Sequence, residues 1–181
     1  MRYTRTILFA IVAIIGVSVI GVNAQNYASK DTPKSIEQQV FKKIRYLPYY
    51  DVFDYITFEV KGSTVILGGK VNSLGTKRQA AAIVKDIPGV SEVVNNIDQL
   101  SPSPGDDRIR REAYRTFVSR GPSQYFSTIA PDVRIIVENG RITLEGYVTY
   151  QSDKNTLNIL ANGVSGAFEV TNNLVVGKRS F

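Results

Sequence analysis

The spacing of hydrophobic residues changes in a fixed order along the first half of the chain. Helical spacing, in which apolar residues recur every three or four positions, gives way to two runs of alternating apolar and polar residues and then returns. A final apolar run is typical of a strand. The elements that these spacings predict are, in order, a helix over 36–47, strands over 56–60 and 65–71, a helix over 80–87 and a strand over 93–97.

The second half of the chain repeats this order. Residues 64–71 read TVILGGKV and residues 141–148 read RITLEGYV, while 89–97 (GVSEVVNNI) and 166–174 (GAFEVTNNL) match at the same spacing. Self-similarity at a fixed spacing is the signature of repeated structural units. Asn139-Gly140 separates the two alternating runs of the second copy, which strongly predicts a hairpin there.

The first helices of the two copies align at a different spacing. Positions Ile36, Val40 and Ile44 correspond to Ile109, Ala113 and Phe117. The second copy therefore has an insertion in the loop after its first helix. We predict an α+β fold made of two tandem α-β-β-α-β modules, each with two helices packed on a small three-stranded sheet.

The predicted boundaries follow from the repeat. The stretch SPSPG should connect the modules, because proline interrupts helices and ladders, and we expect the next helix to begin near Asp106. Modules of this size bury little surface alone, so we expect them to dock on each other. The predicted parts are a signal peptide at 1–24, a linker at 25–34, module 1 at 35–100, a linker at 101–105, module 2 at 106–177 and a tail at 178–181.

The N-terminal segment has the three parts of a secretory signal peptide. Arg2 and Arg5 precede a run without charged residues at 7–22, and Val22 and Ala24 stand at the −3 and −1 positions of a cleavage site. We place cleavage after Ala24, which predicts a periplasmic or secreted protein. An uncleaved inner-membrane anchor is the alternative, because the apolar run approaches the ~20 residues that span a bilayer. The sequence contains no cysteine to carry a lipoprotein anchor.

The repeated motifs also indicate a family. The blocks GSTVILGGKV and NGRITLEGYV, with the endings GVSEVVNNI and GAFEVTNNL, resemble the BON domain of bacterial osmotically induced and nodulation proteins. The resemblance covers residues 35–100 and 106–177. Gly68 departs from the family pattern, in which a polar residue usually precedes the glycine that stands here at 69. The resemblance implies binding to phospholipid or other cell-envelope surfaces, usually in the periplasm, and it supplies no catalytic residue.

The composition removes most catalytic chemistry. Histidine and cysteine are absent, and nucleophilic triads, thiolate or imidazole metal sites and disulfides all need one of them. We interpret the carboxylate pairs Asp51 with Asp54 and Glu138 with Glu145 as surface groups, because neither pair recurs in both copies. We predict no enzyme, no cofactor and no metal site. The net charge of +6 is a small excess for an exported chain, which argues against a nucleic-acid partner.

Two groups of residues are candidate contacts for an envelope surface. Tyrosines crowd the loop after the first helix of module 1, and tyrosine suits the interface between membrane and water. Arginines recur on one side of the first helix of module 2, where guanidinium groups can pair with phosphate. Loop packing and solubility are the alternative explanations, and we assign Leu47 and Phe53 to the core. The candidate lipid-binding residues are Tyr46, Tyr49, Tyr50, Tyr55, Arg108, Arg111 and Arg115.

These observations predict a non-catalytic protein of the cell envelope that contacts anionic phospholipid surfaces. The alternative is a protein-interaction module, such as a stress-related scaffold or holdase with envelope proteins as partners. Salt-sensitive binding to anionic vesicles would favour the first function, and binding to protein partners alone would favour the second.

The signal peptide yields a first testable prediction. Because Val22 and Ala24 suit the cleavage positions, Edman or mass analysis of the exported protein should find Gln25 at its N-terminus. A full-length chain retained in the inner membrane would contradict this prediction and support the uncleaved anchor.

Overall fold

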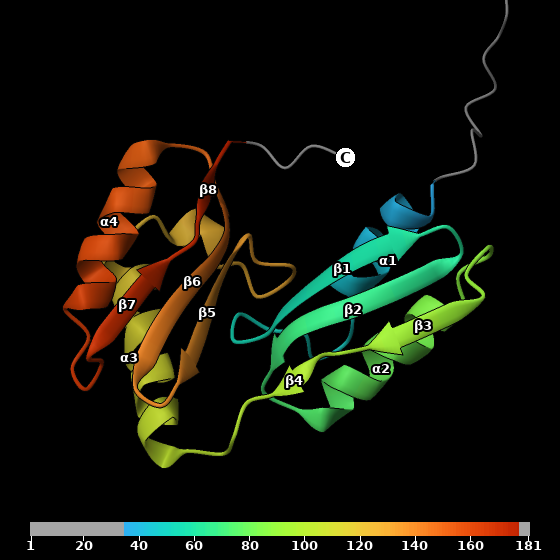
Figure 1. The fold of residues 1–181 in the computed structure, drawn as a ribbon. Helices are drawn as coiled ribbons and strands as arrows, with labels where there is room; N and C mark the ends of the chain where they lie inside the picture. Colours follow the sequence, from blue (N-terminus) through green and yellow to red (C-terminus); the bar gives the residue numbers. More distant parts are fainter. Residues whose placement is uncertain (1–34, 178–181) are drawn as a thin grey trace, which may run out of the picture. The chain divides into compact units, whose positions relative to one another are not determined.

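Two copies of one element order make up the computed structural model, which describes residues 35–177 (Figure 1). The first contains α1 (Ile36–Arg45), β1 (Tyr55–Lys61), β2 (Thr64–Val71), α2 (Leu74–Lys85), β3 (Glu92–Asn95) and β4 (Asp98–Gln99). The second contains α3 (Pro104–Arg120), a short 3₁₀ turn η1 (Ser123–Tyr125), β5 (Val133–Glu138), β6 (Arg141–Val148), α4 (Gln151–Asn162), β7 (Glu169–Asn172) and β8 (Val175–Val176). The predicted signal peptide, the linker at 25–34 and the tail lie outside the described residues.

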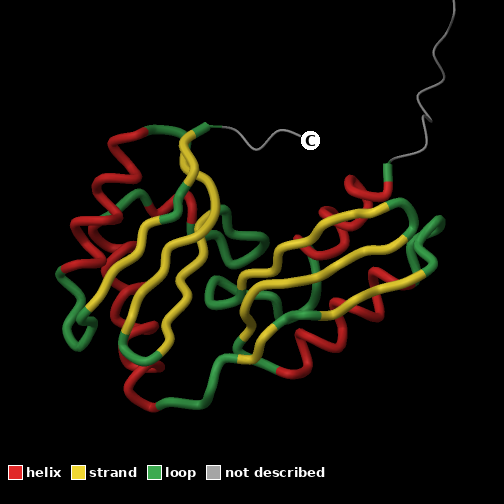
Figure 2. Tube along the Cα trace, in the orientation of Figure 1, coloured by secondary structure: helices red, strands yellow, loops and turns green. Residues whose placement is uncertain are grey.

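The middle strand of each module organises its sheet (Figure 2). Strand β2 pairs antiparallel with β1 through a tight hairpin and in parallel with β3, and β6 pairs in the same two ways with β5 and β7. The parallel pair needs a crossover connection, which α2 and α4 supply. Both helices of each module cover one face of its sheet (Figure 1), which confirms the predicted α+β fold of two α-β-β-α-β modules.

The last strand of each module is interrupted, which the hydrophobic pattern does not predict. In module 1 the side chain of Asn95 donates to the Lys77 carbonyl at 3.0 Å and accepts from the Ile97 N–H at 3.3 Å. Asn172 makes the equivalent bonds to the Lys154 carbonyl and from the Leu174 N–H. These asparagines therefore join the second helix to the sheet, and a two-residue strand, β4 or β8, continues the pairing beyond the break.

The hairpin and the start of α3 in module 2 depend on one buried carboxylate. Asn139 and Gly140 both have positive φ, 50° and 75°, as a hairpin turn of this type requires. Their N–H groups donate to the Asp106 side chain at 2.9 and 2.8 Å. Helix α3 begins at Pro104, earlier than the expected start near Asp106, because Ser103 caps it and proline is tolerated in the first turn.

Each module has its own hydrophobic core between helices and sheet. In module 1, Val40 and Ile44 pack against alternating residues of β2, and Leu47 joins them as expected. In module 2, Ile109, Ala113 and Phe117 take the equivalent positions. Phe53, which we also expect in the core, packs against the core of module 2, because the chain from 50 to 54 turns toward strand β5.

Glycine is required where the first two strands of each module approach closely. Gly69 and Gly146 have φ of 100° and 113°, and a Cβ at either position would overlap the backbone carbonyl of Tyr55 or Asp132. The two positions are equivalent in the repeat, so the constraint belongs to the fold and not to one copy.

This close approach predicts a large difference between two glycine substitutions. Gly146→Ala should lower the free energy of unfolding by more than about 2 kcal/mol, since backbone strain alone costs of order 1–3 kcal/mol. Gly62→Ala, at a turn position with φ of 62° and nothing within 4 Å of the added Cβ, should cost about 1 kcal/mol. Urea unfolding of both variants measures the difference, and equal losses would argue against the contact.

Candidate functional site

The loop between α1 and β1, residues 46–54, exposes two tyrosines. We call it the tyrosine loop. The relative exposure of Tyr46 is 59% and that of Tyr49 is 87%. Tyr49 also has a φ of 64°, a left-handed conformation that is uncommon outside glycine, asparagine and aspartate. The loop therefore holds a large amphipathic side chain in water at some conformational cost, and such outliers concentrate at functional sites.

The other two candidate tyrosines do not belong to this exposed pair. Tyr50 is 8% exposed, its hydroxyl accepts from the Ile56 N–H at 2.9 Å, and the Arg134 guanidinium lies 4.1 Å from its ring centroid. Its prediction as a lipid contact is therefore wrong, because the side chain is buried in the core of module 1. Tyr55 is half-buried in β1, on the opposite face of the strand from Ile56.

The exposed tyrosines have basic and apolar neighbours. Lys42 and Lys43 are exposed on the last turn of α1, and the described residues provide neither of them with an ion pair. Ile129, 71% exposed, lines a shallow groove together with Tyr46 and Tyr49. The groove is completed by Arg45, Leu47, Tyr50, Asp51, Thr128 and Ala130.

Hydrogen bonds to module 2 hold the tyrosine loop in place. The Ile135 N–H donates to the Val52 carbonyl at 2.8 Å, and Arg134 donates to the Asp51 carbonyl at 2.5 Å. Arg45 pairs with Asp132 at 2.9 Å. Val52 itself is buried in the module 2 core. The loop thus covers part of the free edge of β5, and covering an edge strand protects it from pairing with other chains. The two modules therefore contact each other as expected, and both lie within one compact unit.

Asp54 anchors the base of the tyrosine loop. It is 2% exposed, and its carboxylate accepts from the Asn72 N–H at 2.6 Å and from the Asp51 N–H at 3.4 Å. Burial raises the pKa of the Asp54 carboxyl to about 6, while the bond from Asn72 acts in the opposite direction. The expectation that Asp54 is a surface carboxylate is therefore wrong, and its position explains it as a structural group.

The arginines of α3 are exposed as the sequence predicts. Arg108, Arg111 and Arg115 form an outward row that we call the arginine stripe. Arg115 pairs with Glu112 at 3.1 Å, whereas neither Arg108 nor Arg111 has an ion pair among the described residues.

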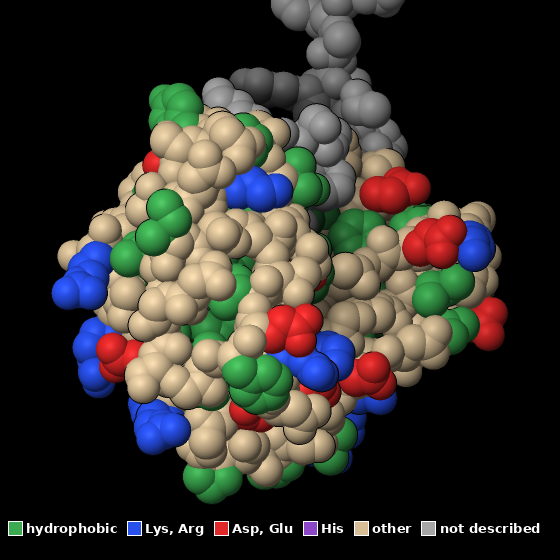
Figure 3. Space-filling view, turned by 60° about the vertical axis from the view of Figure 1, so that its left-hand side comes forward, with side chains coloured by type: hydrophobic (Ala, Val, Ile, Leu, Met, Phe, Trp, Pro, Cys, Tyr) green, Lys and Arg blue, Asp and Glu red, His purple; other side chains and the backbone are tan. Residues whose placement is uncertain are grey.

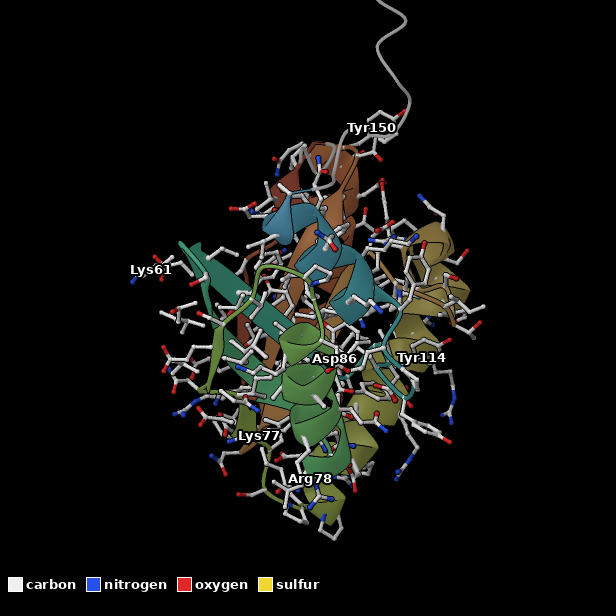
Figure 4. All side chains as sticks on the ribbon, turned by 90° about the vertical axis from the view of Figure 1, so that its right-hand side faces the viewer. Lys61, Lys77, Arg78, Asp86, Tyr114 and Tyr150 are labelled. Carbon is white, nitrogen blue, oxygen red and sulfur yellow. The ribbon has the colours of Figure 1, made fainter. Side chains whose placement is uncertain are left out.

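Tyr114 links the arginine stripe to the tyrosine loop. Its ring centroid lies 6.2 Å from that of Phe53, and Figure 4 shows it projecting from α3. The loop and the helix are therefore neighbours, and the two candidate groups of residues lie on adjoining elements.

Sequence reasoning missed three members of this surface. Lys42 and Lys43 stand on the outer side of an amphipathic helix, where basic residues usually serve solubility alone. Ile129 lies in the longer loop between α3 and β5, where the repeat gives no position-by-position match with the first copy. No helix within residues 35–177 combines the length and the apolar character needed to cross a bilayer.

Comparison with known proteins identifies the same family in both halves of the chain. The model of the BON domain family matches residues 34–100 and 106–178. The outer membrane lipoprotein DolP of Haemophilus influenzae is 33% identical over 107 residues, which are 59% of this chain and 54% of the relative. The chain thus matches about half the length of this curated relative.

Similarity to solved structures is weak. The C-terminal domain of CdsD, a structural protein of the type III secretion system of Chlamydia trachomatis, is 14% identical, covers 81% of this chain and 99% of that one, and has a TM-score of 0.31. A second CdsD structure gives a TM-score of 0.32 at 14% identity, over 78% and 91% of the two chains. At these scores the likeness does not inform fold or function.

The buried carboxyl of Asp54 predicts a pH-dependent stability. The folded protein binds this proton with a pKa of about 6, whereas the unfolded chain binds it near the ordinary value of about 3.9. Acidification from pH 7.5 to 4.5 should therefore stabilise the wild type relative to Asp54→Asn by about 2 kcal/mol. Urea unfolding at several pH values measures this difference, and parallel pH profiles for the two proteins would refute the prediction.

Proposed function

The chain belongs to the BON-domain family, and from that premise we propose that it is a non-catalytic protein of the bacterial cell envelope that binds membrane surfaces rich in anionic phospholipid. The relative that it resembles is named an outer membrane lipoprotein, which supports an envelope location. Exposed side chains would supply the contacts between the described residues and such a surface.

The observation that carries the proposal is the exposed pair Tyr46 and Tyr49 beside Lys42 and Lys43, which have no ion pair within residues 35–177. Tyrosine places an apolar ring in the headgroup region while its hydroxyl stays hydrated. Lysines add attraction to a negative surface, of about 1 kcal/mol for each residue near it. Ile129 supplies further apolar area at the same groove.

The arginine stripe extends this surface along α3. Guanidinium groups form paired hydrogen bonds with phosphate oxygens, and Arg108 and Arg111 are not engaged by carboxylates among the described residues. Electrostatic attraction of this kind decays over a Debye length of about 8 Å at physiological salt, whereas the insertion of tyrosine rings depends little on salt. The two groups of residues should therefore contribute separable terms to binding.

Vesicle co-sedimentation of charge-reversal variants tests the electrostatic part. Replacing Arg108, Arg111 and Arg115 together by glutamate should weaken binding to phosphatidylglycerol-containing vesicles at least about tenfold and flatten its salt dependence. The matched control reverses Lys61, Lys77 and Arg78 of module 1, which Figure 4 labels, and should cost clearly less.

A second pair of variants tests the tyrosines in the same assay. Tyr46→Ser with Tyr49→Ser should weaken binding similarly at every salt concentration, and Tyr150→Ser, where the tyrosine is 64% exposed, is the control. Tyr50 is left intact, because its loss would damage the core. Wild-type binding in both the arginine and the tyrosine variants would overturn the lipid proposal and favour the alternative of a protein-interaction module.

A further inference from the structure

The repeat provides an internal comparison between two modules with one fold. At the hairpin end of the modules, three equivalent positions carry small hydroxyl side chains in module 1 and an aromatic or basic side chain in module 2. The pairs are Ser91 with Phe168, Thr64 with Arg141, and Ser35 with Arg108. Since the fold is the same in both copies, the fold alone does not require the larger residues of module 2.

Module 1 shows what the fold needs at this end. The hydroxyls of Ser63 and Ser91 lie 2.7 Å apart in a hydrogen bond, and the Thr64 hydroxyl donates to Glu92 at 3.3 Å. Ser35 accepts from the Gln38 N–H as the N-cap of α1. Small polar side chains thus suffice to close the hairpin end.

Module 2 instead holds an aromatic ring in solvent. Phe168 is 71% exposed, and its N–H donates to the Gly140 carbonyl at 3.2 Å. Its ring packs over the hairpin turn so closely that a Cβ at Gly140 would collide with it. The backbone and the turn therefore fix Phe168 in an outward position, so its exposure does not come from a loose chain.

One guanidinium group lies beside this ring, and a second lies against the same connection at Gly166. Arg141 lies 5.7 Å from the ring centroid, within cation–π range, and Glu169 holds its Nε at 2.5 Å. Arg108 reaches over Gly166, two residues before Phe168, where its Nη2 would lie 3.2 Å from an added Cβ. Glu169 occupies one edge of Arg141, and Arg108 has no ion pair among the described residues.

We propose that Arg108, Arg141 and Phe168, the Phe168 group, form a second membrane anchor that binds the headgroup of an anionic phospholipid in a bilayer. The inference rests on the proposed function and assigns it a further site. The arginines would pair with the lipid phosphate while the phenylalanine enters the interfacial layer beside it. The exposed ring distinguishes a lipid from a free phosphate, which needs no apolar contact.

The mixture of charges on one face of the molecule argues against a general electrostatic attraction to anionic surfaces. The face of the molecule in Figure 3 mixes basic, acidic and hydrophobic side chains and shows no broad field of one charge. Binding at this end would therefore depend on the few residues of the Phe168 group. Because Arg108 is also the first residue of the arginine stripe, the Phe168 group of module 2 and the tyrosine loop of module 1 would contact the bilayer at two places that α3 connects.

Single-tryptophan variants test the anchor directly, because the natural chain contains no tryptophan. Phe168→Trp should show a blue-shifted emission on vesicles of phosphatidylglycerol and phosphatidylcholine, and none on phosphatidylcholine alone. Ile159→Trp, at a position on α4 with the same 71% exposure, is the control and should not shift. Tyr49→Trp reports on the proposed function independently.

Variants that carry the module 1 residues at the equivalent positions of module 2 test the affinity. Arg108→Ser with Arg141→Thr should weaken binding to the anionic vesicles at least about tenfold, and Phe168→Ser should weaken it at all salt concentrations. Lys61→Ser with Arg78→Thr is the matched loss of charge and should have a smaller effect. Inorganic phosphate at constant ionic strength should not displace the vesicles.

The outcomes separate the two proposals. A shift of Tyr49→Trp without a shift of Phe168→Trp, together with wild-type binding by Phe168→Ser, would overturn the second anchor and leave the proposed function intact. Equal losses of affinity in the Arg108→Ser, Arg141→Thr variant and in its control, Lys61→Ser with Arg78→Thr, would also overturn it. Displacement of the vesicles by inorganic phosphate would overturn it as well. Absence of binding by the wild-type protein would refute the proposed function itself.

Discussion

Each module depends on a middle strand that is paired on both sides. Strand β2 or β6 is joined antiparallel to its hairpin partner and in parallel to the last strand, so one connection can be a tight turn and the other must be a helix. The same pairing decides where loops lie. The hairpin turn and the connection after the second helix meet at one end of the sheet, and the loop after the first helix lies at the other. Function can vary at these two ends without changing the core.

The tyrosine loop and the Phe168 group lie at opposite ends of the module fold. The tyrosine loop follows a first helix, whereas the Phe168 group combines a hairpin turn with the connection after a second helix. Helix α3 starts beside the hairpin, where Asp106 binds the turn, and continues to Tyr114, which contacts Phe53. Its arginine stripe thus runs between both ends, which is a geometric reason to treat the three features as parts of one surface.

Most of the fold could be predicted from the sequence because the repeat supplies two independent copies of each signal. The alternating runs, Asn139-Gly140 and the helical spacing all agree, and such agreement between local signals specifies one structure. The break after Asn95 could not be predicted, because it depends on a bond to the distant Lys77 carbonyl. The sequence also predicts a start of α3 that is too late, because a proline usually interrupts a helix, and only the N-cap at Ser103 shows that Pro104 belongs to the first turn.

The candidate site was predictable only in part, because composition cannot show which tyrosine a core will use. Tyr49 and Tyr50 are adjacent in sequence and identical in chemistry, yet one is 87% exposed and the other 8%. What separates them is Arg134, a residue far along the chain whose guanidinium lies against the Tyr50 ring. A comparison of the two copies position by position is more informative than composition, since equivalent positions share a backbone and differ only in the demands made on their side chains. By that argument, an exposed phenylalanine where the other copy has a hydrogen-bonded serine points to a contact beyond the fold.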